Sequence, residues 1–139
     1  SSDLYELAFT FPFNVLDHRF EKVNMPQGKR FARSVFLQGL LTSRNGLRPD
    51  APVELLNLQK DYHDRLADHH FDPVGFAVSF VDQSEAVDYF LIGVDSTEQL
   101  QDILELELYG QKDMAILDEL LLESDKKWFD PRKWNETIK

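Results

Sequence analysis

Apolar residues along the chain occur partly in short unbroken runs and partly at helical spacing, which predicts a mixed α/β fold. Residues 6–13 form an apolar and aromatic run that ends at Asn14, and residues 31–37 form a second run that leads into Gly39. A third run covers residues 87–92 and is apolar at every position from 89 to 92. Such an unbroken run predicts a strand covered on both faces, as in a parallel sheet.

Apolar residues at every third or fourth position predict helices in the intervening segments. The helix after Pro52 places four side chains on one face: Leu55, Leu58, Tyr62 and Leu66. The next helix is predicted to begin at Asp72 and Pro73, a capping residue followed by a first-turn proline. Ser96 and Gln99 have the spacing of a capping box that opens a third helix. Its expected buried face consists of Leu100, Ile103, Leu104 and Leu108.

A last helix is predicted over residues 114–122, followed by a polar tail with Trp128 and Trp134. The predicted order is therefore strand, strand, two helices, strand, two helices, within a single domain of residues 1–139. Three parallel strands leave two open edges, and open edges of apolar strands invite pairing with other chains. The pattern predicts either a sheet completed by residues outside this chain or a different strand arrangement.

Composition narrows the class of protein. The 139 residues include no cysteine and are 42% hydrophobic, which predicts a packed, disulfide-free domain and fits a reducing cytoplasm. The formal net charge of −10 disfavours binding to nucleic acid or anionic lipid. No apolar run approaches the length of a membrane span, and residues 1–3 do not resemble a secretory signal. A local site could still bind the phosphates of a nucleotide.

Two segments at predicted strand ends carry candidate binding chemistry. Gly93 is followed by the helix start at Ser96, and a helix start offers unpaired N–H groups to a phosphate. Ordinary capping is the favoured interpretation of that segment taken alone. Arg33 lies within an apolar strand, where a guanidinium needs a partner. A ligand could be that partner, and an ion pair with Asp17 or Glu21 is the alternative.

A third cluster contains carboxylates and imidazoles that could bind zinc: Asp61, His63, Asp64, Asp68, His69 and His70. No two histidines of this cluster are four residues apart, so a solvated helix end is the favoured interpretation. We therefore expect no metal site. The nucleophile elbow, the P-loop and the Gly-x-Gly-x-x-Gly motif are all missing from the sequence.

Read together, four segments resemble the aldo/keto reductase family. Residues 11–17 (FPFNVLD) are similar to that family's sixth barrel strand, and residues 32–41 (ARSVFLQGLL) are similar to the seventh. Residues 92–100 (IGVDSTEQL) resemble the eighth strand with its helix, and residues 130–134 (DPRKW) resemble the tail of a bacterial subgroup. The resemblance implies an α/β chain that forms part of a (β/α)8 TIM barrel, namely its last three βα units and a C-terminal helix.

That resemblance also implies a nicotinamide dinucleotide, NAD or NADP, extended along the carboxyl rim. Arg33 would lie against the nicotinamide, and the pyrophosphate would follow Ser34, Phe36, Gln38 and Gly39. The adenosine phosphate would follow Gly93, Asp95 and Ser96, with Gln99 and Asp102 near the adenine. No residue of this chain is assigned a catalytic role, because the family's proton-transfer residues lie in its first four strands.

Several residues depart from the family pattern. Thr10 replaces the glutamine that holds the carboxamide, and Gln99 replaces the arginine that binds the 2′-phosphate of NADP. Ile103 replaces an asparagine near the adenine, and the connection over residues 20–30 is short for a barrel helix. The resulting hypothesis is the cofactor-binding part of an NAD(P)-dependent oxidoreductase acting on a carbonyl or alcohol, with the missing half of the barrel or a second copy as partner.

Two alternatives stay open. One is a non-catalytic module for binding or assembly, which the departures from the family pattern favour. The other is a metal-dependent hydrolase built on the region of His69 and His70.

Overall fold

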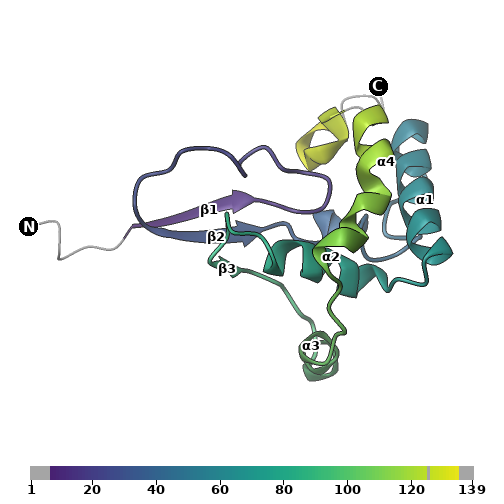
Figure 1. Ribbon diagram of the computed structural model, residues 1–139. Helices are drawn as coiled ribbons and strands as arrows, with labels where there is room; N and C mark the ends of the chain where they lie inside the picture. Colours follow the sequence, from purple (N-terminus) through teal and green to yellow (C-terminus); the bar gives the residue numbers. More distant parts are fainter. Residues whose placement is uncertain (1–6, 125, 135–139) are drawn as a thin grey trace, which may run out of the picture.

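The computed structural model of the protein describes residues 7–124 and 126–134 (Figure 1). Its elements in chain order are β1 (Ala8–Pro12), β2 (Lys29–Arg33), the 3-10 helix η2 (Leu37–Gly39), α1 (Val53–Asp68), α2 (Pro73–Asp82), β3 (Tyr89–Phe90), α3 (Thr97–Leu104), the 3-10 helix η3 (Gln111–Leu117), α4 (Asp118–Glu123) and the 3-10 helices η4 (Lys126–Phe129) and η5 (Pro131–Lys133).

The three strands form one parallel sheet in the order β1-β2-β3. β1 and β2 pair along their full length, from Ala8 opposite Lys29 to Pro12 opposite Arg33. β3 adds only two residues, with Tyr89 opposite Phe31. The predicted strands are therefore confirmed in position, but the second ends at Arg33 and the third is much shorter than expected. Glu6, which the first predicted strand included, lies outside the described residues.

The predicted partial (β/α)8 barrel is wrong. A barrel requires its first and last strands to pair, and the described sheet is open, with three short strands and no closure. The repeating βα unit is also incomplete, because no helix separates β1 from β2. Pro26 and Gly28 both lie in that connection, and each disfavours a helix there. The fold class that the structure supports is a small mixed α/β fold.

The helical core consists of α1, α2, α4 and the turns beside them, and it lies beyond the carboxyl end of the sheet (Figure 1). The predicted face of α1 is confirmed, since all four of its apolar side chains are buried there. The predicted cap of α2 is also confirmed, because Asp72 Oδ2 accepts a hydrogen bond of 2.8 Å from the Gly75 amide. Phe80 and Val81 at the end of α2 pack against Phe11 and Ala32 of the sheet.

The predicted last helix is broken into η3 and α4, and the tail after it is less polar than expected. Trp128 and Phe129 are buried in the helical core. The indole of Trp134 donates a hydrogen bond of 2.8 Å to the carbonyl of Trp128. These aromatic contacts hold the C-terminal turns against α1 and α4.

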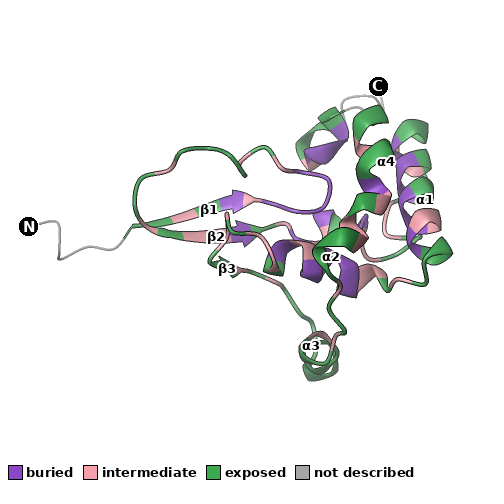
Figure 2. Ribbon diagram, in the orientation of Figure 1, coloured by how far each residue is buried: buried purple, intermediate pink, exposed green. Residues whose placement is uncertain are grey.

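Residues 87–108 are here called the β3–α3 arm; β3 belongs to the sheet, and α3 projects away from the helical core (Figure 1). No residue of α3 is buried, and Figure 2 shows the helix exposed along nearly its whole length. The predicted buried face is wrong: the exposed fractions are 45% at Leu100, 76% at Leu104 and 53% at Leu108. The third strand is not covered on both faces either, because Tyr89 and Leu91 are each 51% exposed.

Candidate functional site

The residues named from the sequence leave the sheet at one edge but in two groups. The first group consists of Arg33, the last residue of β2, and the residues that follow it: Ser34, Phe36, Gln38 and Gly39. The second group consists of residues between β3 and α3 (Gly93, Asp95 and Ser96) and residues on α3 (Gln99 and Asp102). Because the strands are parallel, both exits are at the carboxyl edge, where open α/β sheets bind ligands. Within the described residues, no hydrogen bond or ion pair joins the two groups.

The turn after β2 has unusual backbone geometry. Ser34, Leu37 and Gln38 have positive φ angles of 57°, 49° and 52°, which are uncommon for residues with a side chain. Asn14 supports the turn from β1, because its buried side-chain amide donates a hydrogen bond of 3.0 Å to the Ser34 carbonyl. Such strain persists only where the surroundings hold it, and it occurs often at binding sites.

Gly39 has a structural reason to be glycine. Its φ is +92°, and it packs backbone to backbone against Gly46. A Cβ atom added at Gly46 would lie only 1.9 Å from the Gly39 carbonyl oxygen. The close backbone approach at Gly39 is therefore made to another part of this chain.

Arg33 is exposed and forms no ion pair with any described residue. The two carboxylates named as alternative partners lie elsewhere. Asp17 is completely buried and binds the guanidinium of Arg19 with an Nη2–Oδ2 distance of 2.6 Å. Glu21 lies 3.9 Å from the His18 imidazole. Neither of the two alternative ion pairs of Arg33 is therefore formed.

The group after β3 is organised by helix capping. The Ser96 hydroxyl accepts a hydrogen bond of 3.1 Å from the Gln99 amide, as the capping pattern predicted. The side-chain oxygen of Gln99 accepts a hydrogen bond of 2.7 Å from the Asp95 amide, so this oxygen already has a partner. Gly93 faces open space. Asp95 before the helix, Glu98 in its first turn and Asp102 near its end are all exposed, and these negative charges oppose a second phosphate there.

The suspected metal cluster does not converge. His63 is buried, and its Nε2 donates a hydrogen bond of 2.8 Å to the Leu40 carbonyl. The Asp64 carboxylate accepts hydrogen bonds from Lys60 and Arg44. His69 contacts the Arg65 carbonyl on its own helix. In the part of the chain that the structure describes, no three His, Cys, Asp or Glu residues are grouped as metal ligands. This leaves no geometric basis for a hydrolytic metal centre at His69 and His70.

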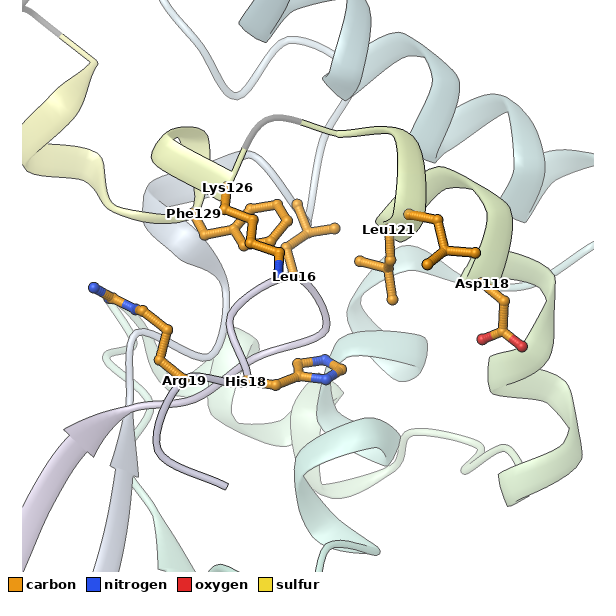
Figure 3. Close-up of a pocket in the computed structure, with 8 residues that line it drawn as sticks. Leu16, His18, Arg19, Asp118, Leu121, Lys126 and Phe129 are labelled. Carbon is orange, nitrogen blue, oxygen red and sulfur yellow. The ribbon is translucent and has the colours of Figure 1, made fainter. Parts of the chain in front are cut away.

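Sequence reasoning missed an open hollow of about 630 Å³ between the loop after β1 and the C-terminal helices (Figure 3). Its wall is mainly apolar, with Leu16, Leu121 and Phe129. Lys126 and His18 add basic groups, and Asp118 lies at the other end in Figure 3. The lining residues are about a hundred positions apart in sequence, so no local pattern could have identified the hollow.

The arginine beside the hollow is held away from it. Arg19 contacts Asp17 at 2.6 Å and Asp130 at 3.8 Å, and in Figure 3 its guanidinium points away from the other lining side chains. Hydrogen bonds from Arg132 lower the pKa of Asp130 to about 2, so this carboxylate stays ionised at neutral pH. Lys126, in contrast, forms no hydrogen bond or ion pair with the described residues.

Comparison with known proteins gives no matching family model and no matching curated protein. Of the helices that the structure describes, none combines the length and apolar character of a membrane span.

Proposed function

We propose that the protein binds a nicotinamide dinucleotide at the carboxyl edge of its sheet and supplies no catalytic acid or base. The observation that carries the proposal is the exposed guanidinium of Arg33 at the end of β2, which pairs with none of the described residues. A guanidinium binds phosphate oxygens with two parallel hydrogen bonds, so an unpaired one at a strand's carboxyl end suits a pyrophosphate. The resemblance to aldo/keto reductases supports the same residues, Arg33 to Gly39.

Two of the three described tyrosines, Tyr62 and Tyr109, favour a non-catalytic role, whereas Tyr89 is exposed on β3. Tyr62 is fully buried with its hydroxyl unpaired, and burial raises its pKa far above the usual range. The Tyr109 hydroxyl accepts a hydrogen bond of 2.9 Å from the Asp72 amide at the start of α2. Neither phenol is placed to donate a proton to a substrate at the sheet edge. The oxidoreductase chemistry of the resembled family would need residues from outside this chain.

Titration with NADH, followed by nicotinamide fluorescence, tests the proposal. Arg33→Met is expected to weaken NADH binding about tenfold, since a charged hydrogen-bonded contact contributes about 1.5–3 kcal/mol. Arg30→Met removes the same charge at the other end of β2 and serves as the matched control. Equal weakening in both variants, or an Arg33→Met variant that binds as the parent does, would refute the site.

The carboxylates of Asp95, before α3, and Asp102, on α3, predict a preference between NADH and NADPH. NADPH carries an extra phosphate that would lie near Asp95 and Asp102, whereas NADH does not. NADH is therefore expected to bind more tightly than NADPH, and Asp102→Asn should narrow the difference. Tighter binding of NADPH by the parent protein would contradict this placement of the adenosine end.

A second candidate function is favoured by the hollow, where Lys126, which pairs with no described residue, adjoins an apolar wall. Its volume of about 630 Å³ falls within the range of ligand pockets, and one basic group among apolar side chains fits an apolar molecule with one negative charge. Decanoate is a suitable probe, with displacement of anilinonaphthalene sulfonate as the measurement. Lys126→Met should weaken decanoate binding and Asp118→Asn should strengthen it, whereas Lys112→Met should do neither. Identical displacement curves for all four proteins would exclude this function.

A further inference from the structure

The β3–α3 arm exposes several large apolar side chains, and none of the residues of α3 is buried. On α3, Leu100 and Leu104 are one helical turn apart and therefore lie on the same face. Leu108, after the helix, is 53% exposed, and Leu91, just after β3, is 51% exposed. Single exposed leucines are common on protein surfaces, but an apolar set gathered on one projecting element marks an interaction site.

The length of α3 gives an independent indication. It has eight residues and buries none of them. Isolated helices shorter than about 12–15 residues are marginal in water, and most helices in proteins are stabilised by packing of their apolar face. Formation of α3 is thus coupled to whatever covers Leu100 and Leu104.

Charge identifies the chemistry of the partner. The arm contains no lysine or arginine and has six carboxylates: Asp88, Asp95, Glu98, Asp102, Glu105 and Glu107. Two of them, Glu105 and Glu107, are neighbours of Leu104 and Leu108 in the sequence. An apolar surface edged by carboxylates is complementary to leucines edged by lysines or arginines.

We propose that the arm is a docking site for a basic amphipathic helix of another polypeptide. A second copy of this chain fits less well, because apposed α3 helices would bring their carboxylates together without a compensating cation. The partner's apolar stripe would lie on Leu100 and Leu104, and its basic side chains would pair with Glu105 and Glu107. Helix-in-groove and helix-on-helix recognition commonly use anchors at this spacing.

A labelled 14-residue peptide of leucine and lysine, with leucines at helical spacing, is the probe. Its fluorescence anisotropy should rise on titration with the protein, and the affinity should fall at high salt. Leu100→Ser with Leu104→Ser should weaken binding at least about tenfold. Val23→Ser with Val53→Ser removes aliphatic side chains of similar exposure (46% and 71%) elsewhere and should leave the affinity unchanged.

Three further measurements separate the possible occupants. A leucine–glutamate peptide of the same pattern should not bind, and Glu105→Gln with Glu107→Gln should reduce both the affinity and its salt dependence. Amide exchange over residues 97–104 should slow when the leucine–lysine peptide is bound. Equal binding of both peptides, no effect of the Leu100 and Leu104 substitutions, or dimerisation of the protein through α3 would each overturn the proposal. None of these readouts involves NADH.

Discussion

The α1 and α3 helices have the same kind of apolar periodicity but differ in burial. Both carry apolar residues at three- and four-residue spacing. The apolar face of α1, with Leu55, Tyr62 and Leu66, is completely buried, whereas the face of α3 is exposed. The difference lies in what surrounds each helix. η2, α2 and the C-terminal turns enclose α1, and no described element lies against Leu100 or Leu104.

This contrast separates two meanings of an amphipathic pattern. Periodicity states which face of a helix would be buried, but not whether this chain supplies the covering surface. In the helical core the apolar face packs against other elements of the same chain. In the β3–α3 arm we propose that the apolar face packs on another polypeptide, and the acidic residues beside it favour a basic one.

The largest effect is expected from one substitution made in both regions. Leu66→Ala removes a completely buried side chain and should lower the free energy of unfolding by about 3 kcal/mol or more. Leu104→Ala removes a side chain that is mostly exposed and should change it by less than about 0.5 kcal/mol. Urea denaturation followed by tryptophan fluorescence provides the measurement. A comparable loss in both variants would mean that α3 packs against the core in solution.

Two glycines extend the comparison to the backbone. An alanine at Gly46 would place its Cβ in collision with the Gly39 carbonyl, which requires the backbone to move. We expect Gly46→Ala to cost about 2–3 kcal/mol. Gly93 has no atom within 4 Å of the corresponding position, so Gly93→Ala should be neutral. Thermal or urea unfolding of both variants tests this, and a neutral Gly46→Ala would show that the contact with Gly39 is loose.

The helix caps give a smaller but sharper contrast. Asp72 and Ser96 each accept a hydrogen bond from the amide three residues later, at 2.8 Å and 3.1 Å. Asp72→Ala should reduce global stability by about 1 kcal/mol, because α2 belongs to the core. Ser96→Ala should leave the unfolding midpoint unchanged and instead accelerate amide exchange of Gln99 and Leu100. If Ser96→Ala shifted the unfolding midpoint, the β3–α3 arm would unfold cooperatively with the helical core.

Local features of the fold were the most predictable from sequence. The face of α1, the cap at Asp72 and the cap at Ser96 depend on residues within a few positions of one another, and all three are confirmed. The barrel prediction failed because closure depends on strand pairing between distant segments. The resemblance implied three βα units of a barrel, but the described chain provides only three short strands and no helix between β1 and β2.

The candidate site was predictable only in part for the same reason. The placement of Arg33 at a strand end followed from the sequence, but its freedom from Asp17 did not, because Arg19 competes for that carboxylate. The hollow joins the loop after β1 to the C-terminal helices, so its Lys126 and Leu16 become neighbours only in the folded chain. The predicted buried face of α3 is wrong because periodicity does not show whether this chain supplies a surface that covers the helix.

The smallest predicted effect is a pH dependence that belongs to the core. Burial lowers the pKa of His63, whose Nε2 donates to the Leu40 carbonyl. Because the folded-state pKa lies below the unfolded value of about 6.5, the unfolded chain binds the proton more readily. The stability that His63 contributes is therefore present above pH 6.5 and is lost as pH falls through the lowered pKa. His63→Gln should flatten the fall in unfolding free energy below pH 6.5 by up to about 1 kcal/mol, whereas His69→Gln, an exposed residue, should not. Parallel urea titrations at pH 7.5 and 5.5 measure the difference, and an unchanged slope in His63→Gln would show that the buried imidazole is not what links the core to pH.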